Sequence, residues 1–276
     1  MNRTDLGAAL RALREASGKE AKAVARGALM SPSKLSKIEN GRTSPGVMDV
    51  ERILTAIGVS DEVKAEYMAA VRAAATEAVA WRQFRRLGYH RKQHQIRALD
   101  ESMAVLKLFQ PALIPGLLQI PEYVRAILAR KDLGEEALSR TIAARIDRQQ
   151  VLYDSAKVFQ FVITESVLRW RMVPAVMMAA QLDRLVSVSR LPNVSIRIIP
   201  LSVGQLDVPA HSFVIRDEKV VTVETIHAEL AITDPRDVAL YVKKFDGFAA
   251  AGLSGDAMRG LLEGIRDEFL REQEMG

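Results

Sequence analysis

Residues Ser31 to Arg42 read SPSKLSKIENGR, and they carry signals for both ends of a short helix. Ser31 is a preferred N-cap residue, and Pro32 suits the first helical position, where a missing N–H costs nothing. Gly41 suits the left-handed position that follows a helix. The stretch therefore predicts a helix of about ten residues, roughly 15 Å long at the usual rise per residue.

Two apolar side chains, Leu35 and Ile38, are the only candidates to anchor this helix in a core. A helix this short is not stable alone, so its neighbours must hold it. At about 100° per residue, most other side chains face away from the anchors. This outward face and its flank carry Ser33, Lys34, Ser36, Lys37 and Asn40. This composition is typical of an ordinary solvated surface, but a surface that contacts another molecule can share it. The neighbouring sequence must decide between these two interpretations.

Apolar residues recur at helical spacing on both sides of this stretch. They predict four further helices, over about residues 6–13, 19–28, 47–57 and 61–74. A helix, a short turn and a second helix within a small bundle form the helix-turn-helix arrangement, whose second helix enters the DNA major groove. This context explains a short helix with a polar outer face, because that face would meet bases and phosphates.

The charge distribution favours the same interpretation. The chain has 276 residues and a net charge of +5. Residues 1–97 hold 18 basic and 10 acidic residues, a net charge of +8, and the remainder has −3. A basic first third on a nearly neutral body indicates an anionic partner. Double-stranded DNA is the leading candidate, and a membrane surface is the alternative.

Composition and motifs narrow the remaining function classes. The chain has no cysteine, and it shows no signal peptide and no apolar run long enough to span a bilayer. We therefore expect a cytoplasmic, nucleoid-associated protein with no membrane partner. No nucleophile elbow, zinc-protease helix, Walker loop or dinucleotide motif occurs. We expect no enzyme activity and no cofactor.

Metal binding is also not expected. His90 and His94 lie four residues apart, but two histidines make only half of a zinc site. The neighbouring side chains would repel a cation, since they are Arg85, Arg86, Arg91 and Lys92. His211 and His227 lie beside predicted strands, and we expect them to be packed rather than metal-ligating.

Residues 5–60 resemble the Xre-type helix-turn-helix family of bacterial repressors. The resemblance is carried by the helix containing Arg14, by Val24-Ala25, Ser31 and Leu35, and by Ile38-Glu39-Asn40-Gly41-Arg42 followed by Pro45. One position departs from the family, because Leu29 stands where the turn usually has glycine. We therefore expect a remodelled turn, with Leu29 or Met30 packing inward.

The resemblance implies a role for each position in the motif. Base edges would be contacted by Ser33, Lys34, Ser36 and Lys37. Lys37 is the strongest candidate for sequence specificity, because lysine can donate to guanine O6 and N7. Phosphates would be held by Asn40, Arg42 and Thr43, with Lys19 and Lys22 as weaker candidates. The acidic Glu39 would form a structural ion pair with Arg14.

The rest of the chain predicts a second domain of mixed structure. Alternating apolar residues predict strands over 158–164, 194–200, 211–217 and 219–225, the last two joined as a hairpin. Helical spacing covers about 102–109, 122–130, 135–155 and 175–189, and two helices end the chain. The predicted class is mainly α, with a five-helix N-terminal bundle and an α+β C-terminal domain with a small sheet. The predicted boundaries are 1–76, a basic linker at 77–97, and 98–276.

Residues 81–270 resemble the antitoxin-like C-terminal domain, of unknown function, that follows such helix-turn-helix modules in high-GC bacteria. The matching phrases include LIPGLLQIPEYV (113–124), ARIDRQQVL (144–152), ITESVLRWRM (163–172) and LPNVSIRIIPL (191–201). The resemblance implies regulation rather than catalysis. Because one such helix reads only a few base pairs, we expect a transcriptional regulator that binds a pseudo-palindromic site as a homodimer. The resemblance also implies a signal from a ligand or from a small protein encoded by a neighbouring gene. In the alternative, the chain is an antitoxin-like module that masks that small protein and autoregulates its operon.

Three features of the second domain leave alternatives open. Glu165 and Glu224 lie near predicted strand ends, where they could be acids of a pocket or pair with arginines such as Arg169. The phrase FQPALIPGLLQI (109–120) could line a small-molecule pocket, but core packing and a dimer surface are favoured.

Overall fold

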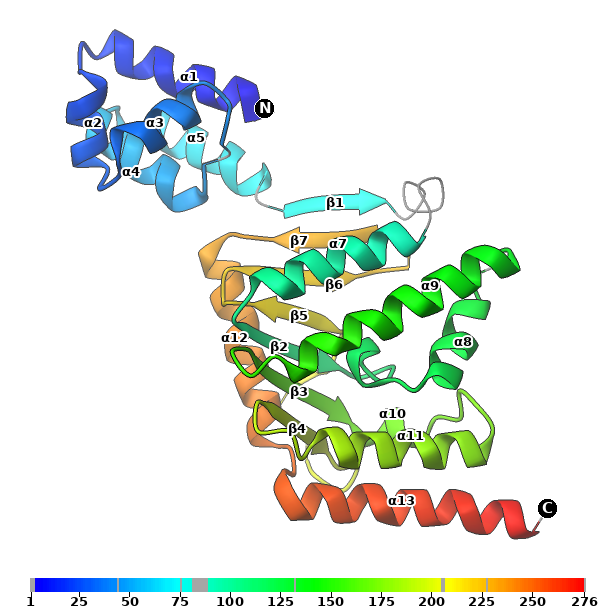
Figure 1. The fold of residues 1–276 in the computed structure, drawn as a ribbon. Helices are drawn as coiled ribbons and strands as arrows, with labels where there is room; N and C mark the ends of the chain where they lie inside the picture. Colours follow the sequence, from blue (N-terminus) through cyan, green and yellow to red (C-terminus); the bar gives the residue numbers. More distant parts are fainter. Residues whose placement is uncertain are drawn as a thin grey trace. The chain divides into compact units, whose positions relative to one another are not determined.

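The computed structural model of the chain describes residues 3–43, 45–74, 76–80, 89–131, 133–204, 207–226 and 228–275 (Figure 1). The chain forms two compact units, residues 1–77 with 231–237 and residues 78–230 with 238–276. Within the described ranges, no helix is long and apolar enough to cross a membrane.

The described part of the N-terminal unit contains the five predicted helices. They are α1 (Arg3–Ala16), α2 (Ala21–Gly27), α3 (Pro32–Glu39), α4 (Val47–Ile57) and α5 (Asp61–Ala74). Their apolar faces share one core, to which α3 contributes the fully buried side chains of Leu35 and Ile38. The helical spacing of these apolar residues was therefore sufficient to predict the bundle.

Both ends of α3 are capped as the sequence predicts. The Lys34 backbone N–H donates to the Ser31 hydroxyl at 3.1 Å, and Pro32 occupies the first helical position. At the other end, Gly41 has a φ of 67°. The N–H of Gly41 donates to Ile38 O at 3.0 Å and that of Arg42 to Lys37 O at 2.8 Å. These two bonds form a Schellman motif, which satisfies the last carbonyls of the helix.

A mixed sheet lies at the centre of the second unit. Across the described ranges its strand order is β1-β7-β6-β5-β2-β3-β4. The strands are β1 (Thr76–Ala80), β2 (Val105–Gln110), β3 (Val158–Thr164), β4 (Val194–Ile199), β5 (Phe213–Arg216), β6 (Val220–Glu224) and β7 (Ala228–Ile232). Strands β2, β3 and β4 are parallel, whereas β5 is antiparallel to both β2 and β6. The predicted mainly α class with an α+β C-terminal part is confirmed, but the sheet is larger than expected.

The prediction of a helix over 102–109 is wrong, because this segment contains strand β2. In β2, Leu106 pairs with Phe159 of β3 on one side and with Arg216 of β5 on the other. The run VLKLFQ is short and mostly apolar, so its spacing does not distinguish a helix from a central strand. Pairing on both sides, which is a tertiary effect, decides the outcome.

The hairpin predicted between β5 and β6 is confirmed. Asp217 and Glu218 both have positive φ, 52° and 51°. Two adjacent residues in this conformation are typical of the tight turns that match the twist of antiparallel strands. The Asp217 carboxylate also accepts from the backbone N–H groups of Ala104 and Val105, each at 2.9 Å, and so joins the turn to the start of β2.

Helices cover the sheet and complete the second unit. They are α7 (Tyr89–Ser102), α8 (Pro121–Ala129), α9 (Glu135–Arg148), α10 (Glu165–Arg169), α11 (Ala175–Val188), α12 (Pro235–Ala250) and α13 (Gly255–Met275), with single 3-10 turns η1 (Gly116–Leu118) and η2 (Gln149–Tyr153). Helices α7 and α9 contact each other and cross the face of the sheet seen in Figure 1, and α13 packs on α11. Phe109 of β2 stacks on Phe248 of α12 with ring centroids 4.1 Å apart.

Residues 77–97, predicted as a basic linker, include the end of β1 and the first part of α7. Residues 81–88 of this segment lie outside the described ranges. The domain boundaries given above remain predictions.

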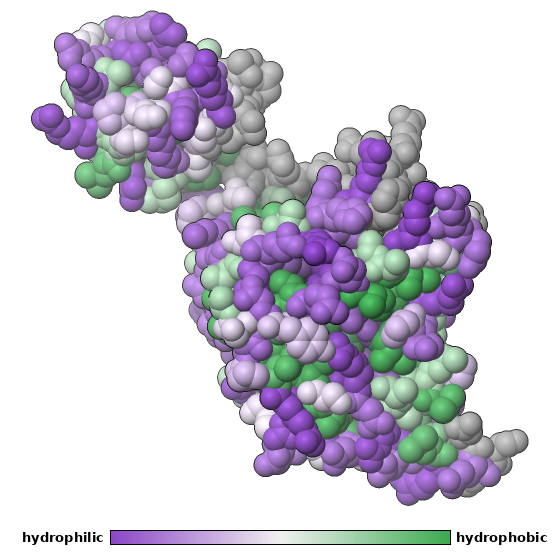
Figure 2. All heavy atoms as spheres, in the orientation of Figure 1, coloured by the Kyte–Doolittle hydropathy of each residue, from purple (hydrophilic) through white to green (hydrophobic). Residues whose placement is uncertain are grey.

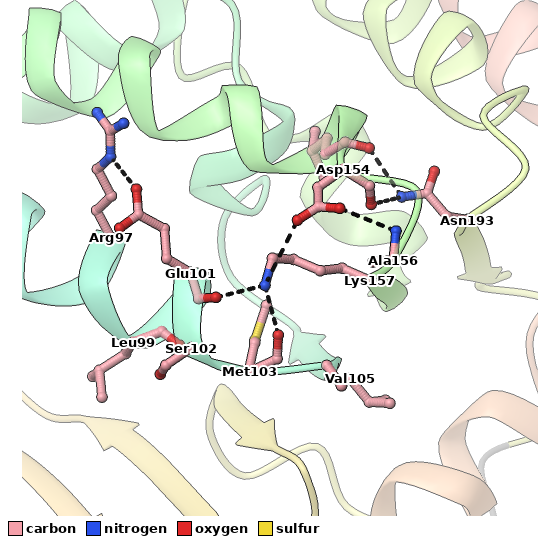
Figure 3. A network of polar contacts seen from close by, with 12 residues as sticks. Arg97, Leu99, Glu101, Ser102, Met103, Val105, Asp154, Ala156, Lys157 and Asn193 are labelled. Carbon is pink, nitrogen blue, oxygen red and sulfur yellow. Dashed lines mark hydrogen bonds and ion pairs between the residues drawn. The ribbon is translucent and has the colours of Figure 1, made fainter.

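A buried lysine connects α7 to the start of β3. The Lys157 ammonium donates to the backbone carbonyls of Glu101 and Met103 at 2.7 Å each, and it lies 3.9 Å from the Asp154 carboxylate (Figure 3). A cation at the C-terminal end of a helix binds the free carbonyls and complements the helix dipole. Lys157 thereby holds the end of α7 in place.

Replacing Lys157 by methionine should destabilise the protein by about 2 kcal/mol, because a buried carbonyl and a part-buried one lose a charged donor. Urea denaturation followed by circular dichroism measures this change in the free energy of unfolding. The matched control is Lys219→Met, since Lys219 is exposed in the same unit. Equal stabilities of the two variants would contradict the assigned role.

Candidate nucleic-acid interface

An ion pair joins α1 to the end of α3. Arg14 Nε lies 2.7 Å from Glu39 Oε1, and Arg14 Nη2 lies 3.0 Å from Glu39 Oε2. Both side chains are largely buried, with 13% and 7% of their surface exposed. The hydrogen bonds that Arg14 donates to the Glu39 carboxylate raise the pKa of Arg14 above its ordinary value. The predicted Arg14–Glu39 pair is thus present, and its bidentate geometry restricts the orientation of α3.

A glycine allows α1 to approach the end of α3 closely. A Cβ atom placed on Gly7 would lie 2.3 Å from the Ile38 carbonyl oxygen, which no real side chain tolerates. It would also lie 3.3 Å from the Glu39 carbonyl oxygen. Gly7 therefore sets the distance at which Arg14 meets Glu39. The sequence did not predict this role, because a glycine within a helix has no spacing signal of its own.

The outward face of α3 carries the side chains predicted to meet DNA. Ser33, Ser36, Lys37 and Asn40 are all exposed. The Asn40 side-chain amide donates to the Ser36 backbone carbonyl at 2.7 Å and lies 3.3 Å from its hydroxyl. Figure 2 shows that the N-terminal helices present a mainly hydrophilic surface in this view. The structure thus brings four of the predicted residues onto one face.

The two lysines of α3 differ in their contacts. The Lys34 ammonium lies 2.7 Å from Asp49 Oδ1 of α4, so it can reach a base only by breaking this ion pair. Lys37 is exposed, and its ammonium has no hydrogen-bond or ion-pair partner among the residues that the structure describes. Lys37 is therefore the better-placed cation for a DNA base.

The predicted phosphate contacts also differ in availability. Lys22 and Arg42 are exposed, and Thr43 is half-buried. The Lys19 ammonium instead donates to the Ala56 carbonyl near the end of α4, at 2.9 Å. Arg26 was not predicted, although it is exposed on α2 one turn after Lys22. The spacing of four residues between the two cations was the signal that could have identified it.

The turn before α3 keeps the geometry that usually requires glycine. Leu29 has a φ of 55°, in the left-handed region, and its side chain is 78% exposed. Met30 packs against the apolar core. The expectation of a remodelled turn is therefore wrong in its main point, because Leu29 accepts the strained backbone conformation. The inward packing expected of Leu29 or Met30 is made by Met30.

The candidates in the second unit have separate outcomes. Glu165 is buried, pairs with Arg169 at 2.6 Å and accepts from the Leu201 N–H at 2.8 Å, so it has a structural role. His211 Nε2 lies 3.0 Å from the Tyr241 hydroxyl. His227 and the side chain of His90 lie outside what the structure describes. Across the described residues, no group of three or more metal-ligating side chains occurs.

The phrase FQPALIPGLLQI has two roles rather than one. Ile114, Leu117 and Leu118 are buried in the main core of the second unit, as favoured. Residues from Phe109 to Gln119 also line a cavity, and Glu224 lies on its wall. The phrase therefore borders a cavity as well as the core, and a small molecule in that cavity stays a prediction.

Comparison with known families identifies both parts of the chain. Residues 5–67 match a family model described as a helix-turn-helix domain. Residues 93–264 match a model described as a domain of unknown function (DUF5753). No curated protein matches the chain.

Two solved structures show a weak likeness to this fold. One is a phospholipase D family member, Nuc from Salmonella typhimurium, with a TM-score of 0.36 and 11% identity over 65% of this chain and 97% of that chain. The other is TrmBL2, an archaeal chromatin protein whose structure shows a novel mode of DNA binding. It has a TM-score of 0.32 and 13% identity over 74% of this chain and 66% of that chain. Both TM-scores lie below 0.5, so neither protein's activity is transferred to this chain.

Replacing Leu29 by glycine should stabilise the N-terminal unit by about 1 kcal/mol, because glycine adopts the left-handed conformation without a Cβ penalty. Thermal unfolding of the full chain measures the expected rise in melting temperature. Leu29→Ala is the control, since alanine removes the exposed side chain but keeps the Cβ atom. A stabilisation of both variants to the same extent would contradict backbone strain as the cause.

Replacing Arg14 by methionine should destabilise the protein by about 3 kcal/mol, because Glu39 would remain as a buried unpaired carboxylate. The double variant Arg14→Met/Glu39→Met should recover part of this loss, since it removes both charges. Arg11→Met is the matched control on the same helix, because Arg11 and Glu15 form an ion pair that is about half exposed, at 53% and 52%. Chemical denaturation compares the four proteins, and equal losses for Arg11→Met and Arg14→Met would contradict the role of burial.

Proposed function

The chain belongs to the family described as domain of unknown function (DUF5753), and a helix-turn-helix domain precedes the matched region. From this premise we propose that the protein is a sequence-specific DNA-binding transcriptional regulator. The observation that carries the proposal is the outward face of α3, where Lys37, which has no ion-pair partner among the described residues, lies among exposed polar side chains. In this proposal α3 is the helix that reads the DNA sequence, and it enters the major groove as in Xre-type repressors.

Each group on this face has a physical role in the proposal. Lys37 donates to guanine, and Ser33 and Ser36 contact neighbouring base edges. Arg42, Lys22 and Arg26 neutralise phosphates, which supplies affinity without reading sequence. The Arg14–Glu39 pair touches no base, and it keeps α3 at a constant angle to the rest of the bundle.

Several finer features belong to the same proposal. One α3 helix reads only a few base pairs, so a homodimer on two half-sites about one helical turn apart is expected. The second unit would contribute the dimer contact and receive a signal from a ligand or a small protein partner. The proposal places the protein in the cytoplasm on the nucleoid and gives it no chemical turnover. No structural observation specifically favours the antitoxin-like alternative.

Fluorescence anisotropy with the DNA upstream of the protein's own gene, compared with a scrambled duplex, tests the proposal. Lys37→Ala should weaken binding to the specific duplex about 10-fold or more and leave binding to the scrambled one nearly unchanged, because a base contact is lost. Arg42→Ala should weaken binding to both duplexes, and it should reduce the salt slope by about 1.

Lys34→Ala is the matched control on the same helix, because the Lys34 ammonium is held by Asp49. Its effect on discrimination between the two duplexes should be smaller than that of Lys37→Ala. Unchanged discrimination in Lys37→Ala, or wild-type protein that binds both duplexes equally, would refute α3 as the reading helix for this site.

A further inference from the structure

A cavity of about 210 Å³ lies within the second unit, where α7 and α9 cross the sheet. Its walls come from these two helices, from strands β2, β5 and β6, and from the loop that holds η1. On the face of this unit seen in Figure 2, hydrophobic side chains lie between hydrophilic ones. The cavity is large enough for a small organic molecule rather than for water alone.

Two arginines of α9, Arg145 and Arg148, line this cavity. They lie three residues apart, so both project from the same side of the helix. The Nε atoms of both are shielded from solvent and have no hydrogen-bond partner within the part of the chain that the structure describes. Arg145 Nη1 donates to Gln119 Oε1 and Arg148 Nη1 donates to Gln93 Oε1, each at 3.2 Å. The side-chain hydrogen-bond acceptors of these two Nη1 atoms, Gln119 and Gln93, are thus neutral amides, which do not neutralise a guanidinium.

The acidic residues around the cavity do not balance these charges. Asp100 is the nearest buried acid, with 1% of its side chain exposed, and Arg216 donates to its Oδ1 from both Nε and Nη2. Arg148 Nε lies 3.5 Å from Asp100 Oδ2 without forming a hydrogen bond. Glu229 is paired with Lys92. The single carboxylate of Asp100 therefore interacts with both Arg148 and Arg216.

Arg145 is the least compensated of the group. Among the described residues, no carboxylate lies within ion-pair distance of it, and Glu224 acts on it only from farther away. Burial, together with repulsion from Arg148, lowers the pKa of Arg145 to about 10. A largely buried cation without an ion-pair partner destabilises the folded state, so a site that retains one is expected to gain stability from an added anion.

Apolar side chains form part of the remaining wall, beside polar ones such as Ser212, Thr222 and Glu224. Leu106, Leu108 and Phe213 come from the central strands, and Ile114 and Leu117 come from the loop around η1. The loop lies close to the arginines at Gly116, where a Cβ atom would be 3.4 Å from Arg148 Nη2. The cavity thus combines a cationic end with an apolar body.

We propose that this cavity binds a small amphipathic organic anion, whose carboxylate or phosphate group is held by Arg145 and Arg148 and whose apolar part packs on the leucines of β2. Guanidinium groups donate to both headgroups through parallel hydrogen bonds, so the two share one recognition chemistry. The use of this site as the input of a regulator rests on the proposed function, whereas the binding itself does not.

Thermal unfolding and calorimetry of the full chain test the proposal with hexyl phosphate, hexanoate, inorganic phosphate and neutral 1-hexanol. Hexyl phosphate or hexanoate should raise the melting temperature by about 5 °C near saturation, because the ligand binds only the folded state. Inorganic phosphate should compete with either, and 1-hexanol should give little shift. The better of the two anions identifies the headgroup.

Arg145→Met should weaken binding of the effective anion at least about 10-fold, because a charged bidentate donor is lost. The unliganded variant should melt no lower than the wild type, since it no longer buries an uncompensated charge. Arg140→Met is the matched control on α9, because Arg140 is 56% exposed and pairs with Glu136. It should bind like the wild type.

Three results would overturn the proposal. The first is the absence of a shift with both organic anions on the wild-type protein. The second is an equal response to 1-hexanol, and the third is unchanged anion binding in Arg145→Met. Should that variant not fold, competition by inorganic phosphate on the wild type decides, and failure to compete overturns the proposal. None of these results depends on DNA binding, so they are separate from a failure of the anisotropy test.

Discussion

The Arg14–Glu39 ion pair is the interaction on which the candidate DNA-binding surface depends. Helix α3 has eight residues and only two fully buried apolar anchors, so neither its own hydrogen bonds nor its core contacts determine its angle. A two-pronged ion pair between largely buried partners restricts both distance and rotation. Gly7 makes this pair possible, because any larger residue would push α1 away from the end of α3. Because the ion pair and the buried anchors hold α3, the polar side chains on its outer face are not needed for the stability of the bundle.

In the turn before α3, the strained backbone and the apolar packing contact belong to two neighbouring residues. Leu29 accepts a left-handed backbone that would favour glycine, and its exposed side chain adds no core contact. The neighbouring Met30 supplies the apolar contact instead. The bundle therefore tolerates local strain of about 1 kcal/mol, because the capped ends and the ion pair over-determine the position of α3.

The second unit places buried charge where a purely structural protein would avoid it. Asp100, Arg148 and Arg216 form a compact group beside strand β2, and among the described residues Arg145 next to it has a neutral hydrogen-bond partner, Gln119, and no ion-pair partner. Strand β2 lies between β3 and β5, and its Leu106 and Leu108 line the cavity together with residues of α7 and α9. The cavity is consequently built from segments that are far apart in sequence.

The sequence by itself determined the local features of this protein. The caps of α3, the five-helix bundle, the β5–β6 hairpin and the exposed face around Lys37 all follow from short-range spacing and turn chemistry. Tertiary structure alone decided the strand at 105–110, the close approach at Gly7, the commitment of Lys34 to Asp49 and the meeting of Arg145 with the η1 loop. The physical reason is that local signals act within a few residues, whereas strand pairing and the neutralisation of charge depend on partners brought from distant parts of the chain.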